Sequence, residues 1–183
     1  MNNSTTPSMK VVNAPDLRLR IKTKSVKKIN QGLIQTLKDM VKLTKTFKDP
    51  EGVGLASTQV GLRESFFVAK FATKKGRKFA SIINPKILST SKKTKKYFEG
   101  CLSIPNIWGE VKRATQIKVS YQNSDGRQVT ETLKGVQAWI FQHEVDHLNG
   151  ILFSDRCLEQ KGKFYRFTGK DEIGTETFQE ITI

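Results

Sequence analysis

The feature that most constrains this chain is the pentapeptide His143-Glu144-Val145-Asp146-His147. Its two histidines are the only ones among 183 residues, and they stand four positions apart. In a helix this spacing places both imidazoles on one face, one turn apart, where they can bind the same metal ion. Glu144 lies beside that face, and its carboxylate can accept a proton from water acidified by the ion.

The flanking residues indicate the limits of this helix. Apolar positions follow a helical period from Val136 to Leu148, and Asn149-Gly150 is typical of a left-handed cap. Without a metal, so apolar a helix would bury imidazoles and carboxylates that nothing satisfies. We therefore favour a metal-binding helix over a purely structural one.

A third metal ligand must come from outside the helix, since catalytic metal sites usually combine three protein ligands with one open position. The candidates are Cys101, Cys157, Asp155, Glu159 and Glu172. One of the carboxylates would suit a thermolysin-like zinc endopeptidase, which cuts internal peptide bonds. We favour Cys101, because Gly100 permits a tight backbone there and the neighbouring residues indicate a rigid bend rather than the middle of a strand.

A second glycine-containing segment, Gly52–Gly61, is too poor in bulky side chains for a core strand. Its backbone is expected to approach another group closely, although a tight turn alone would also explain the glycines. Gln59, near its end, carries an amide that can donate to an oxygen on which negative charge develops.

The rest of the chain predicts one further helix and several strands. Apolar residues recur at three- and four-residue steps over Asn30–Phe47, which indicates an amphipathic helix. Four β-prone runs predict two hairpins, Phe66–Phe71 with Phe79–Ile83 (followed by Pro85) and Thr115–Tyr121 with Arg127–Leu133. The C-terminal segment Lys163–Ile183 favours strands over helix.

Composition bounds the class of protein. The length predicts one domain, residues 9–183, after a flexible polar tail, residues 1–8. No apolar run approaches the roughly 18 residues of a membrane helix, no secretory signal is visible, and both cysteines are expected to be free thiols. The net charge of +15 favours anionic surroundings such as RNA. The lysines are dispersed without interleaved aromatic residues, so sequence-specific nucleic-acid binding is not expected.

Three segments together resemble the peptide deformylases, whose recurring motifs are GxGLAAxQ, EGCLS and HExDH. Here they are Gly52–Gln59, Glu99–Ser103 and His143–His147, in the same order, and the similarity covers roughly residues 9–160. With the predicted elements, the resemblance implies an α+β fold. Antiparallel β-sheets would pack around a central metal-binding helix, with an amphipathic helix near the N-terminus.

The resemblance implies a metal-dependent hydrolase that removes the formyl group from N-formylmethionyl ends of new polypeptides and releases formate. By position, Cys101, His143 and His147 match the metal ligands, and Glu144 matches the general acid/base. Gln59 and the backbone N–H of Leu102 match the groups that hold the reaction's oxyanion. The residues expected to contact substrate are Gly54, through its backbone, and Val53, Tyr97, Val136 and Trp139, around the methionine side chain.

The resemblance also implies a cofactor and a setting. The expected ion is Fe²⁺ in cells, while a thiolate and two imidazoles also suit Zn²⁺ or Ni²⁺ in purified protein. The expected partners are N-formylmethionyl nascent chains, with the positive charge favouring proximity to the ribosome or its RNA, and no membrane. The expected location is the bacterial cytoplasm, with an organelle of bacterial origin as the second choice.

The sequence departs from the family pattern in three places. Ser57 replaces a usual alanine, and Trp108 stands where other members place different residues that face the bound peptide. The segment Thr175–Ile183 is strand-like, unlike the long final helix that some members use to dock on the ribosome. A deformylase-like binding module without turnover is a further alternative, but Glu144 and Gln59 argue against it, because a protein kept only for binding needs no acid/base.

Overall fold

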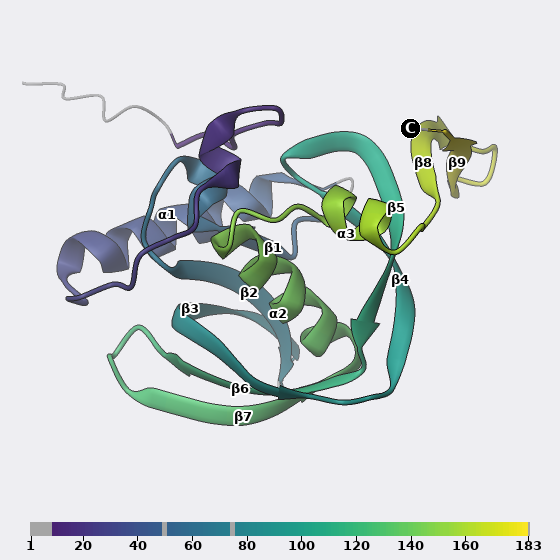
Figure 1. The fold of residues 1–183 in the computed structure, drawn as a ribbon. Helices are drawn as coiled ribbons and strands as arrows, with labels where there is room; N and C mark the ends of the chain where they lie inside the picture. The colour runs from purple at the N-terminus through teal and green to yellow at the C-terminus, as the bar shows by residue number, and fades with distance from the viewer. Residues whose placement is uncertain (1–8, 49–50, 74–75, 183) are drawn as a thin grey trace, which may run out of the picture.

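The computed structural model describes residues 9–48, 51–73 and 76–182; the predicted tail, residues 1–8, lies outside them. Figure 1 shows helices and strands in an α+β arrangement. In chain order the elements are η1 (Leu17–Arg20), α1 (Gln31–Thr46), β1 (Gly54–Ala56), η2 (Ser57–Val60), β2 (Phe66–Thr73), β3 (Gly76–Thr90), β4 (Thr94–Cys101), β5 (Ile104–Ala114), β6 (Gln116–Gln122), β7 (Gln128–Lys134), α2 (Gly135–Leu148), α3 (Phe153–Glu159), β8 (Phe164–Lys170) and β9 (Glu176–Ile181).

The strands form two antiparallel sheets. One has five strands in the order β1-β2-β3-β6-β7, and the other has four in the order β4-β5-β8-β9. Helix α2 contacts β1, β2, β6 and β7 of the first sheet and β5 of the second, so it lies between them (Figure 1). The expected α+β class with antiparallel sheets is confirmed.

Strand β2 shows how the sequence builds the core. Phe67 and Ala69 pack with Phe141 of α2, whereas Phe66 and Val68 pack on the opposite face with Met40 of α1. Successive side chains of a strand point to opposite faces. Because both faces of β2 pack in the core, consecutive residues of its sequence are apolar. Helix α1 begins after Asn30, whose side chain accepts a hydrogen bond from the Leu33 N–H at 2.9 Å.

Both predicted hairpins are present, as β2–β3 and β6–β7. The expectation that Pro85 follows the end of its strand is wrong, because β3 continues to Thr90. The pairing of β3 with β6 shifts between Ile83 and Lys86, and Asn84 there adopts a positive φ of 50°. Such a bulge lets a strand pass a proline, which has no N–H to pair.

The exclusion of a core strand from Gly52–Gly61 is also wrong. Gly54–Ala56 forms β1, which is buried throughout and pairs with β2. Strand β1 pairs with β2 and contacts α2, and its Leu55 is fully buried in the core with Met40 and Phe66. In the C-terminal segment the predicted strands are present as β8 and β9. Among the described residues, no helix is long and apolar enough to span a membrane.

Candidate metal centre

Two elements bring three potential ligands together. Helix α2 carries His143 and His147, whose ring centroids lie 4.9 Å apart, and β4 ends at Cys101. The ligand atoms of these residues all lie within 4.8 Å of one another, and Cys101 Sγ is 3.2 Å from His147 Nε2. One face of α2 thus carries both imidazoles, and β4 of the four-stranded sheet carries the thiol.

Cys101 stands at a break in strand pairing. Gly100 pairs with Trp108, but Cys101 pairs with Ile104, so the chain reverses within a few residues. A Cβ on Gly100 would lie 3.0 Å from the Trp108 ring, a closer contact than most real Cβ atoms make. Glycine therefore leaves room for the Trp108 ring over the backbone beside the thiol, and the predicted bend at this cysteine is present.

The donor set fits a divalent metal ion. A thiolate with two imidazoles suits Zn²⁺ or Fe²⁺, and three protein ligands leave a position open. Within the described part of the chain, three buried polar atoms lack a hydrogen-bond partner, Trp139 Nε1, Glu144 Oε2 and His147 Nδ1, and all belong to helix α2. Of these atoms, Glu144 Oε2 belongs to the residue next to His143, and solvent held at a bound ion would satisfy it.

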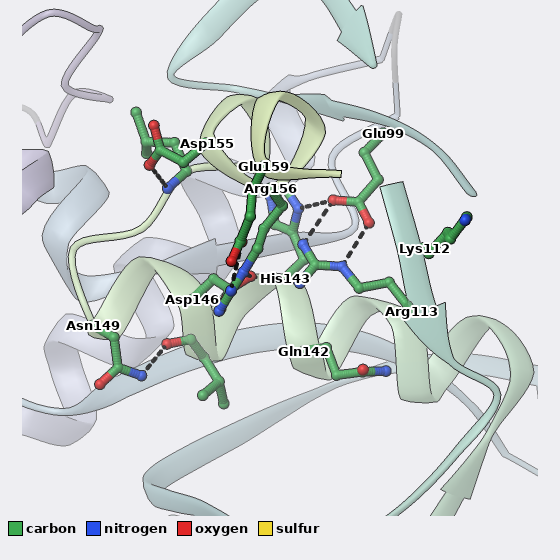
Figure 2. Close-up of polar contacts among 12 residues, drawn as sticks. Glu99, Lys112, Arg113, Gln142, His143, Asp146, Asn149, Asp155, Arg156 and Glu159 are labelled. Carbon is green, nitrogen blue, oxygen red and sulfur yellow. Dashed lines mark hydrogen bonds and ion pairs between the residues drawn. The ribbon is translucent and has the colours of Figure 1, made fainter. Parts of the chain in front are cut away.

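His143 is oriented by a buried carboxylate. Its Nδ1 lies 2.9 Å from Oε2 of Glu99, a residue with no exposed surface, so its Nε2 is the nitrogen left for a metal. Arg113 donates to the same carboxylate from Nε at 2.8 Å and Nη2 at 2.9 Å (Figure 2). Burial acts to raise the pKa of Glu99, but the hydrogen bonds from Arg113 and His143 outweigh it and hold the pKa at about 2.

The charge network continues along α2. Arg113 also reaches Asp146, which accepts hydrogen bonds from Arg156 Nε at 3.1 Å and Nη2 at 2.9 Å (Figure 2). Asp146 is thereby satisfied by two guanidinium groups and does not compete for the ion. The network ties β4, β5, α2 and α3 to one another close to the ligands.

Glu144 is nearly fully buried, at 3% exposure, beside the ligands. Burial raises the pKa of Glu144 to about 7. The charge of His143 acts to lower this pKa, and the charge of Glu99 acts to raise it further. Gly54 of β1 lies directly against this carboxylate, and a Cβ at position 54 would collide with Glu144 Oε1. The close backbone approach expected of this glycine segment is therefore present.

Gln59 is held with its amide nitrogen towards the thiol. The Ala56 N–H donates to Gln59 Oε1 at 2.9 Å, which fixes the side chain. Its Nε2 then donates to Ser103 Oγ at 3.1 Å and lies 3.4 Å from Cys101 Sγ.

A cavity of about 370 Å³ opens on these groups. Of the residues predicted to act, its walls include Val53, Gly54, Gln59, Cys101, Leu102, Val136, Trp139, His143 and Glu144. Tyr97 is not on the wall but stacks on Trp139 with ring centroids 5.0 Å apart. His147 lies behind the wall, 1% exposed.

Among the described residues, the group of potential ligands does not include the downstream carboxylates considered as third ligands, Asp155, Glu159 and Glu172. Asp155 pairs with Arg20, and Glu159 pairs with Arg156. Cys157 is a buried free thiol packed with Phe153 and Phe164.

Comparison with known proteins decides the family. The sequence profile described as polypeptide deformylase matches residues 8–163. This chain belongs to the polypeptide deformylase family. Peptide deformylase of Thermotoga maritima is 44% identical over 143 residues, covering 78% of this chain and 83% of the relative.

Solved deformylase structures have the same fold. The crystal structure of the Thermotoga maritima enzyme matches with a TM-score of 0.74 and 40% identity, covering 81% of this chain and 96% of that one. A class I type b deformylase from Acinetobacter baumannii with bound Met-Ala-Ser matches with a TM-score of 0.71 and 31% identity, covering 81% and 97%.

In this deformylase-family chain, sequence reasoning missed the groups that orient the ligands. Glu99 and Asp146 stand inside the quoted motifs, and a buried acid implies a cationic partner. That signal does not select Arg113 and Arg156 from 32 lysines and arginines, because their contacts depend on how the two sheets pack.

Proposed function

We propose that this chain is a metal-dependent peptide deformylase, which hydrolyses the N-formyl group from the N-terminal methionine of new polypeptides and releases formate. One observation carries the proposal: in a chain of this family, Cys101, His143 and His147 converge beside a buried Glu144 at the wall of an open cavity. A bound divalent ion would supply a Lewis acid that polarises the formyl carbonyl and lowers the pKa of water.

Glu144 is the residue that moves the proton. Its carboxylate takes a proton from the attacking water at an Oε atom and gives it to the leaving amine nitrogen. Because its pKa is about 7 before an ion is bound, the group can both accept and donate a proton near neutrality. The absence of a side chain at Gly54 leaves the space that the Glu144 carboxylate occupies.

Two donors stabilise the oxygen on which charge develops. Gln59 Nε2 faces Cys101, and its amide cannot turn over without losing the Ala56 N–H donor. The Leu102 N–H directly follows the thiol ligand in sequence. Fixed donors of this kind stabilise a transition state without reorganising during the reaction.

The remaining predicted residues would bind the substrate. The Gly54 backbone pairs with the peptide, and Val53, Val136 and Trp139 form an apolar wall for the methionine side chain, with Tyr97 stacked behind. We propose Fe²⁺ as the ion in cells and Zn²⁺ or Ni²⁺ as substitutes in purified protein.

The proposal extends to the setting of the enzyme. Residues 9–183 would act as one catalytic domain on N-formylmethionyl nascent chains, in the bacterial cytoplasm or, as a second choice, a bacterial-type organelle. The net charge of +15 supports work near the ribosome and its RNA.

The test compares three substrates with protein purified without oxygen and loaded with Fe²⁺, Ni²⁺ or Zn²⁺. We expect formate from formyl-Met-Ala-Ser, no acetate from acetyl-Met-Ala-Ser, and no cleavage of internal peptide bonds in a longer peptide that is blocked at both ends. Cleavage of internal bonds without formate release would instead favour the endopeptidase alternative.

A further inference from the structure

The C-terminal hairpin, β8 with β9, lies beyond residue 163, where the match to the family profile ends. It extends the sheet that carries Cys101, because β8 pairs with β5 at Ile107–Gly109. Figure 1 shows the hairpin at the end of the chain, beside β5. This segment is therefore placed to alter the surroundings of a site that the rest of the chain shares with its relatives.

Aromatic rings connect the hairpin to Trp108. Trp108 stacks on Phe98 with centroids 5.3 Å apart, and Phe178 of β9 meets both rings edge-on, at 4.9 Å from Phe98 and 5.6 Å from Trp108. Phe167 of β8 lies 5.7 Å from Phe178. Trp108, Phe167 and Phe178 are only half-buried, so these fixed rings keep surface that a ligand can contact.

A second cavity, of about 240 Å³, lies against these rings. Its apolar lining consists mainly of Phe47, Leu102, Ile104, Ile107, Trp108 and Phe167. It shares Gly100, Cys101, Leu102, Trp108 and Glu176 with the cavity of the candidate metal centre. The two cavities therefore adjoin along the wall that contains the thiol ligand.

We propose that the C-terminal hairpin, through Phe167, makes this second cavity select an apolar side chain on one of the two residues that follow the formylmethionine. An extended peptide advances roughly 3.3 Å per residue, so a chain whose first residue occupies the metal-centre cavity reaches an adjoining one within a residue or two. The mostly apolar lining selects an aliphatic or aromatic side chain over a polar one. The inference rests on the proposed deformylase function and adds to it a preference that the C-terminal hairpin creates.

The test is kcat/KM for formate release from formyl-Met-Xaa-Ser and formyl-Met-Ala-Xaa, with Xaa as leucine or serine. We expect leucine to exceed serine by about tenfold at one of the two positions, the scale of discrimination that an apolar pocket provides. In Phe167→Ala this ratio should fall towards one, and Phe167→Leu should restore most of it.

Thr168→Ala is the matched control, since Thr168 belongs to the same strand, is exposed and lines neither cavity. It should keep the leucine-to-serine ratio, and circular dichroism would verify that each variant is folded. Equal values for leucine and serine at both positions, or an unchanged ratio in Phe167→Ala, would overturn the subsite while leaving deformylation intact. Formate release from none of the peptides would overturn the proposed function and the subsite together.

Discussion

At the scale of single residues, Glu99 links the metal centre to the buried charges around it. It has no exposed surface and accepts hydrogen bonds from both His143 and Arg113. Carboxylates in this position fix the orientation of a histidine ligand and raise its basicity. We therefore propose Glu99 as a positioning residue that would act on a bound ion through His143.

Replacing Glu99 tests this role. Glu99→Gln should lower metal affinity by about 10- to 100-fold, since the amide orients His143 less firmly. It should also lower the free energy of unfolding by about 3 kcal/mol, because Arg113 loses its buried partner. Chelator competition and urea unfolding measure the two effects. Glu110→Gln, which removes a more exposed partner of Lys96 on the same sheet, should alter neither measurement strongly; equal metal affinity in the two variants would contradict the role.

Gly54 tests the close approach to Glu144. In Gly54→Ala the added methyl group would displace the Glu144 carboxylate, so kcat for formate release should fall at least tenfold; a misplacement of about 1 Å can cost as much as 100-fold in rate. Gly32→Ala in α1 adds the same methyl group far from the site and should leave kcat unchanged. Unchanged kcat in Gly54→Ala would mean that the Glu144 position is not critical.

At the scale of elements, regular patterns of apolar residues predicted helices and hairpins correctly, whereas irregular segments did not reveal the strands they form. The helical period over Val136–Leu148 and the turn signal between β6 and β7 located those elements, because local sequence determines them. The proline predicted that β3 ends near Pro85. In the structure the Asn84 side chain hydrogen-bonds to the Val26 backbone, and β3 continues to Thr90. Likewise, β1 forms because it pairs with β2, and the glycine-containing sequence around β1 does not indicate this pairing.

Asn84 supports that continuation. Its side chain accepts from Val26 N at 2.8 Å and donates to Val26 O at 3.0 Å. Asn84→Ala should lower the free energy of unfolding in urea by about 2 kcal/mol through lost hydrogen bonds and backbone strain at positive φ. Asn84→Gly removes the hydrogen bonds without the strain and should cost less. Equal losses in both variants would show that the strain contributes nothing.

At the scale of the whole molecule, the candidate ligands connect the two sheets. Cys101 comes from the four-stranded sheet, while α2, with both histidines, packs on the five-stranded one. The sequence predicted these ligands because their motifs are contiguous. It did not predict the aromatic contacts between Trp108 and the C-terminal hairpin, since those residues are distant in sequence and carry no shared motif.

Metal removal should therefore destabilise the whole fold. An ion that binds the native state at 100 to 1,000 times its Kd adds about 3–4 kcal/mol to the free energy of unfolding. Calorimetry should show a lower Tm after chelation and recovery on adding Fe²⁺ or Zn²⁺. A Tm that does not respond to the ion would contradict a site that joins the two sheets.

The central claim is that Glu144 performs proton transfer beside an ion held by Cys101, His143 and His147. The most direct measurement is formate release from formyl-Met-Ala-Ser, with metal content determined on the same samples of the wild-type protein and Glu144→Ala. We predict equal metal content and a loss of nearly all turnover in the variant. Near-normal turnover in Glu144→Ala with its metal bound would contradict the account.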